Sequence, residues 1–400
     1  MKIFVLNCGS SSIKFQFINT DDGHVLAKGL VEKIGENMGI YSYKSEPYTK
    51  KNLNVLIENH TKGIDFILKD LLHAEHGVIT SIDQIDGVGH RVVHGGESYS
   101  ESVIIDDNVK KAIRSCFEIA PLHNPANMMG IEAVEKVLPG IKHVAVFDTA
   151  FHQTIPARAY LYGLPLKYYN ENKIRKYGFH GTSHKFVAGR VSEYERRMLR
   201  SMKIITCHIG NGASITAIKH GKSVDTSMGF TPLAGLLMGT RSGDLDPAIP
   251  LFMIENMGMS VAEVQDVLNK KGGILGLSEY SNDMREIEDK ILYEHDQKIA
   301  TALDVYCYRI KKFIGAYAAA MNGVDIIVFT GGVGENMPIL REMVCTDMEY
   351  LGVKIDVKKN NTRVEDVLEF STEDSKVKLL KIATNEELMI ALETEELLSK

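Results

Sequence analysis

Residues 3–17 run from Ile3-Phe4-Val5-Leu6 through Asn7-Cys8-Gly9-Ser10-Ser11-Ser12 into Ile13-Lys14-Phe15-Gln16-Phe17, and residues 203–218 have a similar arrangement. That second stretch runs from Lys203-Ile204-Ile205-Thr206 through Cys207-His208-Ile209-Gly210-Asn211-Gly212-Ala213-Ser214 into Ile215-Thr216-Ala217-Ile218. Each is an apolar strand, a turn of small polar residues and a returning strand, the pattern of a β-hairpin. The tip of such a hairpin presents backbone N–H groups and hydroxyls to an anion. Two copies, one in each half, predict a duplicated fold that binds a phosphate-bearing ligand.

Length and composition are those of a two-domain globular protein. The chain has 400 residues, of which 44% are apolar and 24% charged, enough for two full-sized cores. A net charge of −6 argues against a broad surface for nucleic acid. If the ligand is an anion, a few individual arginines and lysines must therefore supply the positive charge locally.

The five cysteines, Cys8, Cys116, Cys207, Cys307 and Cys345, form no C-x-x-C pair. This scatter favours buried thiols in a reducing compartment over a disulfide or zinc framework. No apolar run approaches the roughly 18 residues that a membrane span needs. Because a strand pattern begins by Ile3, it leaves no room for a signal peptide. We therefore expect a cytoplasmic protein with no membrane partner.

Strand and helix patterns alternate along the chain, which favours an α/β architecture. Residues 144–147 read as a buried strand that ends at Asp148, and residues 326–329 read as another that ends at Gly331. We interpret them as a second pair of equivalent strands in the two halves. Ligands of such sheets gather at the carboxyl ends of the strands, so Asp148 and the turn at Gly331 are candidate site positions.

Several motifs of other enzyme classes are absent. No G-x-x-x-x-G-K-[ST] occurs, which excludes a P-loop enzyme. Residues 210–212 and 332–334 both begin like the dinucleotide fingerprint G-x-G-x-x-G, but neither has the third glycine, which disfavours a dehydrogenase. There is also no G-x-S-x-G nucleophile elbow.

Two glycine-rich turns and one lysine suggest a nucleotide site. A single turn of this kind is more often just a polar hairpin, but Lys14 places a cation beside the first tip. The second tip, residues 208–212, gains specificity from the sequence Gly332-Val333-Gly334-Glu335-Asn336. Glycines allow the backbone to approach phosphate and ribose where a Cβ would clash.

Two arginines lie among small residues. Arg91 lies between Gly89 and Gly95, and Arg241 between Gly239 and Gly243. Either could be a surface arginine, but a guanidinium also matches a carboxylate bidentately, and arginines stabilise a phosphoryl group in transfer.

Three further positions have a structural alternative of about equal or greater weight. His180 precedes a helix start, where an anion would be stabilised, but single histidines are usually structural. Asp148 could simply cap the next turn. The residues alone favour an exposed helix face for Asp283-Met284-Arg285.

Taken together, these motifs resemble the acetate kinase family. The resemblance is collinear from the first strand to Thr384-Asn385-Glu386-Glu387 and rests on residues 7–12, 90–96, 147–152, 178–184, 208–212, 238–244 and 332–336.

The resemblance implies the fold of the acetate and sugar kinase, heat-shock ATPase and actin superfamily. That fold has two duplicated, ribonuclease H-like α/β domains with the active site in the cleft between them. We expect residues 1–150 with the C-terminal helix 385–400 to form an N-terminal domain for acetate and metal. Residues 151–384 would form the nucleotide-binding and dimerisation domain of a homodimer.

The resemblance also implies the reaction, in which ATP and acetate give ADP and acetyl phosphate, reversibly and with Mg²⁺, for which Mn²⁺ can substitute. Arg91 and Arg241 would bind the carboxylate and stabilise the transferring phosphoryl group, and His180 would stabilise its equatorial oxygens. Asp148 matches the residue described as an acid or base. A carboxylate nucleophile is already ionised at pH 7, so we expect Asp148 to orient Arg91 or the metal shell instead.

The remaining positions carried over from the family fall into three groups. Asn7 and Glu386 match the magnesium positions. The apolar pocket for the acetate methyl group is expected at Val93, Leu122, Phe179 and Pro232. The nucleotide site is expected at Lys14, His208, Ile209, Gly210, Asn211, Gly212, Asp283, Met284, Arg285, Gly332, Val333, Gly334, Glu335 and Asn336, with Arg285 near the adenine.

Two alternatives stay open at this point. The acid could be propionate or butyrate, because one methylene changes discrimination by only about 1–3 kcal/mol; Val93, which is larger than alanine, favours acetate. A non-enzymatic ATP-switch protein of the same fold is disfavoured. The two kinase-like halves leave no residues for a further functional domain, and both Arg91 and Arg241 are present.

Overall fold

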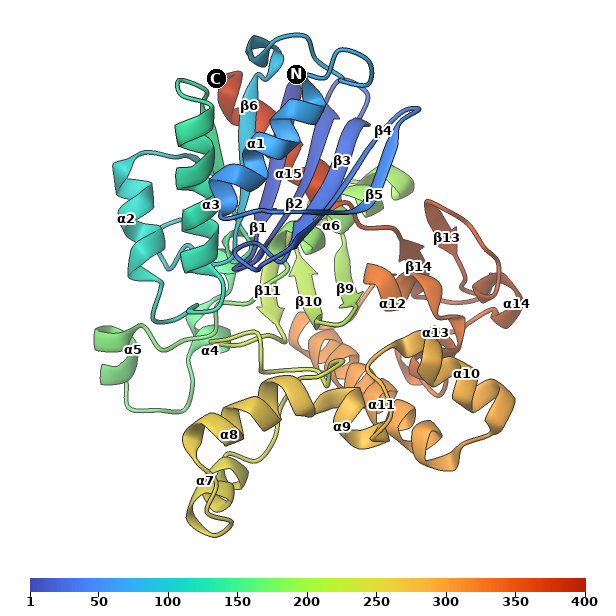
Figure 1. Ribbon diagram of the computed structural model, residues 1–400. Helices are drawn as coiled ribbons and strands as arrows, with labels where there is room; N and C mark the ends of the chain where they lie inside the picture. The colour runs from blue at the N-terminus through green and yellow to red at the C-terminus, as the bar shows by residue number, and fades with distance from the viewer. The chain divides into compact units, whose positions relative to one another are not determined.

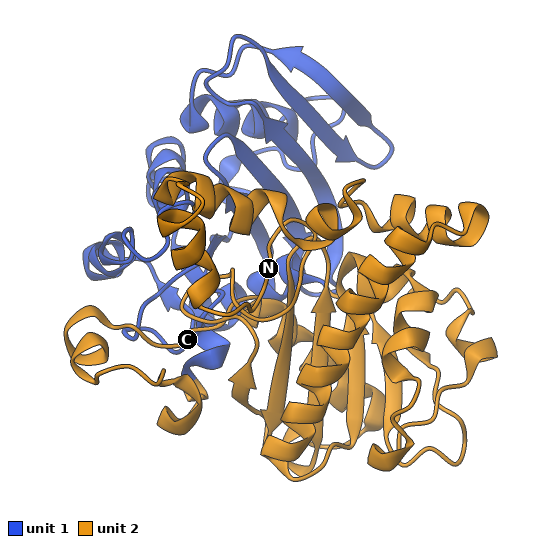
Figure 2. Ribbon diagram, turned by 90° about the horizontal axis from the view of Figure 1, so that it is seen from below, with its two compact units in different colours: residues 1–153, 385–400 blue, residues 154–384 orange.

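A computed structural model describes residues 1–400. The chain divides into two compact units, residues 1–153 with 385–400 (unit 1) and residues 154–384 (unit 2) (Figure 2). Each unit contains its own sheet of parallel and antiparallel strands with helices packed on it. The predicted α/β class with two domains is therefore confirmed.

The sheet of unit 1 has eight strands in the order β5-β4-β3-β2-β1-β6-β8-β7 (Figure 1). Its strands are β1 (Lys2–Cys8), β2 (Ser12–Asn19), β3 (His24–Glu32), β4 (Gly39–Ser45), β5 (Thr49–Val55), β6 (Gly87–Val92), β7 (Val103–Ile104) and β8 (His143–Phe147). Strand β1 pairs antiparallel with β2, as the first hairpin predicts, and parallel with β6.

Helices cover both faces of this sheet. They are α1 (His60–Leu71), α2 (Asp107–Ser115), α3 (Asn124–Val137) and α15 (Glu386–Leu398). Because side chains of a strand alternate between faces, β1 serves two cores. Phe4 and Leu6 belong to the core that includes Ile64 of α1 and Val134 of α3. Ile3 and Val5 belong to the core on the other face, which α15 closes.

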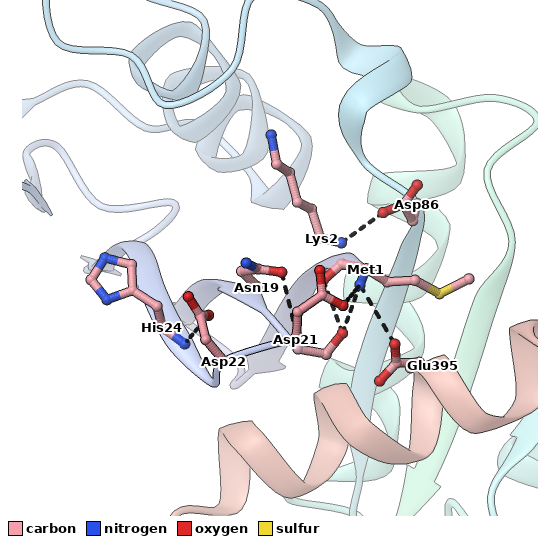
Figure 3. A network of polar contacts seen from close by, with 9 residues as sticks. Met1, Lys2, Asn19, Asp21, Asp22, His24, Asp86 and Glu395 are labelled. Atoms are coloured by element: carbon pink, nitrogen blue, oxygen red, sulfur yellow. Dashed lines mark hydrogen bonds and ion pairs between the residues drawn. The ribbon is translucent and has the colours of Figure 1, made fainter.

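The C-terminal helix α15 lies directly against β6 because that strand offers glycine. A Cβ added to Gly89 would lie 2.6 Å from Thr394 Oγ1, so any other residue there would push the helix away. Figure 3 shows a second contact of α15, between the amino terminus and Glu395. The amino group of Met1 donates to Thr20 Oγ1 at 2.9 Å and lies 3.5 Å from a carboxylate oxygen of Glu395 on α15. Both chain ends are thus held in unit 1.

The sheet of unit 2 has six strands in the order β11-β10-β9-β12-β14-β13 (Figure 1). They are β9 (Lys203–Ile209), β10 (Ala213–Lys219), β11 (Lys222–Thr226), β12 (Ile326–Thr330), β13 (Val367–Glu369) and β14 (Lys378–Ile382). The run β11-β10-β9-β12-β14 repeats the run β3-β2-β1-β6-β8 of unit 1, with the same pattern of antiparallel and parallel pairs.

This repeat corrects one interpretation. The sequence pairs residues 144–147 with residues 326–329 as equivalent strands, but β12 takes the place of β6, next to the first strand, and β8 takes the place of β14. Short, fully buried parallel strands share one apolar pattern, so composition alone could not distinguish these two places.

The helices of unit 2 are mostly short, apart from α6 and α11. They are α4 (Ala157–Tyr160), α5 (Lys167–Asn172), α6 (Gly181–Glu195), α7 (Ala248–Glu255), α8 (Val261–Asp266), α9 (Gly273–Ser278), α10 (Met284–Glu294), α11 (Gln297–Met321), α12 (Gly331–Asn336), α13 (Pro338–Cys345) and α14 (Val357–Asn360). Both α6 and α11 pack on the sheet, α6 against β9 and α11 against β9 and β10. None of the helices combines the length and apolar character that crossing a bilayer requires.

One buried carboxylate stabilises the outer part of unit 1. Asp70 of α1 accepts a hydrogen bond from Lys50 Nζ at 2.6 Å and one from His76 Nε2 at 3.1 Å. The ring of His76 stacks on Tyr48 with 3.8 Å between centroids. Burial by itself raises the pKa of Asp70, but the hydrogen bonds from Lys50 and His76 outweigh it, so the pKa lies below its ordinary value.

We expect Asp70→Asn to lower the free energy of unfolding of unit 1 at pH 7 by about 1–3 kcal/mol, the cost of leaving buried partners unpaired. A depressed carboxylate pKa stabilises the fold above the unfolded pKa, and this stabilisation is lost as the pH falls through the folded pKa. The difference between the two proteins should therefore shrink as the pH drops below the ordinary value of 3.8. Urea unfolding at a series of pH values measures it.

The matched control is Asp65→Asn on the same helix, whose pair with Lys62 is exposed and 3.6 Å long. We expect a change below about 0.5 kcal/mol there. Equal losses in the two variants, or a difference independent of pH, would contradict the assignment.

Candidate functional site

Arg91 and Asp148 form a bidentate pair at the carboxyl ends of two neighbouring parallel strands. Arg91 lies near the end of β6, and Asp148 follows β8 directly. Arg91 Nε donates to Asp148 Oδ1 at 3.2 Å, and Nη2 donates to Oδ2 at 2.6 Å. The side chain of Asp148 is buried, and its charge raises the pKa of Arg91 above the ordinary range. Asp148 therefore fixes the orientation of the guanidinium, as its interpretation as an orienting residue requires.

Glu386, the first residue of α15, lies in the electrostatic field of this pair. Its Oε1 is buried and has no hydrogen-bond partner. Burial raises the pKa of Glu386, Arg91 opposes this, and the charges of Asp148 and Glu387 add to it. A carboxylate oxygen that is buried without a partner beside other carboxylates is well suited to a cation.

The first hairpin tip belongs to the same end of unit 1. Asn7 and Lys14 are cross-strand neighbours in β1 and β2, and the Lys14 ammonium pairs with Glu387 of α15. Asn127 of α3 fastens the tip, because its Nδ2 donates to the carbonyl of Cys8 at 2.9 Å while its Oδ1 accepts from the N–H of Val93 at 3.0 Å. The sequence analysis did not identify Asn127.

The second hairpin tip forms a narrow turn in unit 2. The N–H of Gly210 donates to the carbonyl of Gly212 at 3.1 Å, and the N–H of Gly239 donates to the carbonyl of Asn211 at 3.0 Å. The space beside Gly212 is faced by two side chains. A Cβ at Gly212 would lie 3.6 Å from Arg241 Nη1 and 3.6 Å from His180 Nε2. Three predicted site elements therefore meet within this unit.

Arg241 differs from Arg91 in having no carboxylate partner. Its Nη1 lies 3.3 Å from the carbonyl oxygen of Pro232 and 3.8 Å from Met238 Sδ, both neutral acceptors. Burial lowers its pKa below the ordinary value. An anion beside Gly212 would be a counter-ion for this cation.

The glycine-rich segment 331–336 is the short helix α12, which follows β12 directly. The carboxylate of Glu335 turns inward, where Oε1 accepts from the N–H of Gly331 at 2.8 Å, from Thr330 Oγ1 at 3.3 Å and from the N–H of Thr384 at 3.1 Å. In this structure its carboxylate therefore holds the segment together.

Arg341 fixes the end of the same segment and was not identified from the sequence. It is 2% exposed. Its Nη1 donates to the carbonyls of Gly334 and Glu335 at 2.8 and 2.9 Å, and its Nε and Nη2 donate to Oδ1 and O of Asn360 at 2.7 and 2.8 Å. Burial lowers the pKa of Arg341 to about 10. It satisfies carbonyls at the end of α12 that have no partner within the helix.

The segment Asp283-Met284-Arg285 begins α10. The Asp283 side chain caps the helix by accepting from the N–H of Arg285 at 2.9 Å, and the Arg285 guanidinium pairs with the same carboxylate. This pairing lowers the pKa of Asp283 to about 2. The side chain of Arg285 is 88% exposed. The segment is therefore an exposed helix start, as the residues alone suggest.

The four residues expected around the acetate methyl group are divided between the units. Val93 and Leu122 lie in unit 1, and Phe179 and Pro232 lie in unit 2. Val93 and Phe179 are buried, whereas Leu122 is 74% exposed. No group of three or more histidine, cysteine, aspartate or glutamate side chains is arranged to hold a metal ion.

Comparisons with known proteins show the family and the fold of the chain. Residues 2–392 match the model of the acetokinase family. The chain is 55% identical to the acetate kinase of Caldicellulosiruptor saccharolyticus, with 100% of both chains covered. The crystal structure of Porphyromonas gingivalis acetate kinase is 48% identical with a TM-score of 0.95, and that of a propionate kinase from Francisella tularensis is 40% identical with a TM-score of 0.91. Each of these two alignments covers 99% of both chains.

Arg341→Lys is expected to raise the KM for a nucleotide while leaving the KM for the second substrate within about twofold. A lysine keeps the positive charge, but its ammonium cannot bond the carbonyls of α12 and Asn360 at the same time as the planar guanidinium does. Helix α12 therefore loses its fixed position. Steady-state kinetics with each substrate varied in turn, on protein whose thermal unfolding shows that it is folded, measures this. Arg363→Lys, at an exposed arginine, is the control, and equal changes in both KM values would contradict the assignment.

Proposed function

The chain belongs to the acetokinase family and is an acetate kinase, and we propose that it transfers the γ-phosphoryl group of ATP directly and reversibly to acetate with Mg²⁺. The observation that carries the proposal is the convergence of Arg241 Nη1 and His180 Nε2 beside Gly212. One cation and one ring nitrogen face a turn whose backbone can come close to phosphate. Phosphoryl transfer needs positioning and charge stabilisation more than covalent chemistry.

In this proposal Arg241 and His180 act on the phosphoryl group itself. The negative charge on its equatorial oxygens must be held while the attacking and leaving oxygens approach in line. Arg241 supplies a positive charge that no carboxylate of the protein neutralises. His180 donates a hydrogen bond to the same group. Donors that are already in place at the moment of transfer reduce the barrier most, because nothing has to reorganise.

Arg91 binds the acetate carboxylate, and Asp148 holds Arg91. The bidentate pair at 2.6 and 3.2 Å supports this assignment, since it restricts the guanidinium to one orientation. No general base is required, because acetate is ionised at neutral pH. We therefore assign Asp148 as a positioning residue for Arg91.

Asn7 and Glu386 are the proposed positions for Mg²⁺. The orphaned, buried Oε1 of Glu386 fits a cation, and the absence of a larger ligand cluster fits an ion that keeps several waters and binds through one or two carboxylates and substrate phosphates. When bound, Mg²⁺ would neutralise phosphate charge. Mn²⁺ has similar ligand preferences and can substitute.

The nucleotide is proposed to bind along the two glycine-rich segments of unit 2. Residues 208–212 would approach the phosphates and residues 332–336 the nucleoside, with Asp283, Met284 and the exposed Arg285 beside the adenine. Lys14, which pairs with Glu387, is proposed to exchange this carboxylate for a phosphate.

Acetate is favoured over longer acids by Val93, with Leu122, Phe179 and Pro232 completing the pocket. A propionate kinase among the relatives, 40% identical, keeps propionate as the second candidate.

We also propose a homodimer. Helix α7 has no buried residue, and Ile249, Leu251 and Phe252 on it are 47%, 57% and 57% exposed. Although α7 packs against α8, it leaves these apolar side chains exposed, so they are suited to a second copy of the chain. The five cysteines are all free and buried, which supports a reducing, cytoplasmic location.

Trapping the acyl phosphate with hydroxylamine tests the reaction directly. With ATP and Mg²⁺, we expect kcat/KM to fall from acetate to propionate to butyrate, by roughly 10-fold or more for each added methylene. No product should form when the metal is chelated. A higher kcat/KM for propionate would make propionate the preferred acceptor instead of acetate. If no acid gave an acyl phosphate, the catalytic assignment would be overturned.

The two arginines should each be essential. We expect Arg91→Ala and Arg241→Ala to lower kcat/KM by a factor that corresponds to roughly 2.7–4 kcal/mol, the scale of one preorganised donor. Arg114→Ala, at an exposed arginine paired with Glu132, is the control and should leave kcat/KM unchanged. A loss below tenfold at either Arg91 or Arg241 would contradict its role.

A further inference from the structure

Three buried polar side chains form a continuous row of hydrogen bonds behind His180. Ser214 Oγ of β10 lies 2.9 Å from His180 Nδ1 and 2.8 Å from His184 Nε2, and His184 Nδ1 lies 2.7 Å from Thr206 Oγ1 of β9. Ser214, His184 and Thr206 are all 0% exposed. All four residues belong to unit 2.

The backbone of His180 is also held in an unusual conformation. It precedes α6 with φ = 56°, in the left-handed region that costs a residue with a Cβ about 1–2 kcal/mol. Such strain persists only where the surroundings fix it, and it clusters at functional sites. The row of hydrogen bonds is one such constraint, because it holds the ring that this backbone presents.

The protons in this row can be placed by counting. A threonine hydroxyl has one proton, and the hydrogen-bond partner of Thr206 Oγ1 is His184 Nδ1. If Thr206 accepted this bond, its own proton would be buried without an acceptor, which costs more than an unused lone pair. Thr206 therefore donates to His184 Nδ1.

The remaining protons follow from this first one. When His184 is neutral, its imidazole has one N–H, so it carries its proton on Nε2 and donates to Ser214 Oγ. The single proton of Ser214 is then directed to His180 Nδ1, which accepts it. Neutral His180 consequently carries its own proton on Nε2. This nitrogen and Arg241 Nη1 would both lie 3.6 Å from a Cβ added at Gly212.

We propose that Ser214, His184 and Thr206 are positioning residues that hold His180 as the tautomer with its proton on Nε2. In that form His180 presents a hydrogen-bond donor to an anion beside Gly212. In the other tautomer it would present a lone pair to the same anion. The effect on turnover rests on the proposed function of His180 in phosphoryl transfer, whereas the tautomer itself does not. A lone pair facing phosphoryl oxygens would repel them.

The tautomer can be observed by NMR of protein labelled with ¹⁵N-histidine, at a pH of roughly 8 where imidazoles are neutral. The His180 signals are identified by their loss in His180→Asn. We expect the wild type to carry the His180 proton on Nε2 and Ser214→Ala to show a mixture of both tautomers. We also expect kcat of Ser214→Ala to fall about tenfold or more, as for one lost preorganised hydrogen bond, with the KM values for ATP and acetate within about twofold.

Thr216→Val is the matched control. Thr216 lies two residues further along β10, is equally buried, and its hydroxyl pairs with Thr226 at 2.9 Å and with no histidine. It should change neither the His180 signals nor kcat. If Ser214→Ala does not fold, Thr206→Val removes the first donor of the row with little change in volume and should also shift His180 toward the second tautomer.

Wild-type His180 with its proton on Nδ1, or unchanged His180 signals in both Ser214→Ala and Thr206→Val, would overturn the proposal. A changed tautomer with unchanged kcat would support the row of hydrogen bonds and overturn the role of His180 in phosphoryl transfer.

Discussion

The close contact of α15 with β6 is the constraint on which unit 1 depends. Gly89 leaves room for Thr394 and Ile390, so the last helix closes the apolar face formed by Ile3 and Val5. The same contact brings Glu386 into the electrostatic field of Arg91 and Asp148. A substitution that separated helix and strand would therefore expose a core and also remove a carboxylate from the site.

In unit 2 the candidate site segments are held in place by buried polar groups rather than by a helix–strand contact. Glu335 joins the start of α12 to Thr384, and Arg341 joins the end of α12 to Asn360. The hydroxyl of Ser183 lies 2.8 Å from both Thr384 Oγ1 and His208 Nδ1. Thr384 is the last residue of this unit, and Asn385 and Glu386 follow it in the chain. The two proposed nucleotide segments, residues 208–212 and 332–336, are thus joined by hydrogen bonds to Thr384, which lies two residues before Glu386.

The fold could largely be predicted from the sequence because its signals are local. Short apolar runs around glycine-rich tips predict the two hairpins, but they do not show which of the later strands correspond in the two units. Most of the bonds that position the site could not be predicted, since they join residues distant in sequence. The Arg91–Asp148 pair spans 57 positions and the Asn127–Cys8 bond 119. Nothing local distinguishes Arg341 or Ser214 from an ordinary helix or strand residue, and one of the donors to Glu335, the N–H of Thr384, lies 49 positions away in the sequence.

The two arginines, similar in the sequence, differ in electrostatic state. The charge of Arg91 is already compensated by buried Asp148, which raises its pKa, while Arg241 has only neutral acceptors and a pKa lowered by burial. An anion arriving at Arg91 must share the guanidinium with Asp148 and gains mainly a fixed orientation. An anion arriving at Arg241 compensates a partly buried charge that has no carboxylate partner, and it gains more electrostatic free energy. This difference suits Arg91 to a singly charged carboxylate that needs positioning, and Arg241 to a phosphoryl group whose charge must be stabilised.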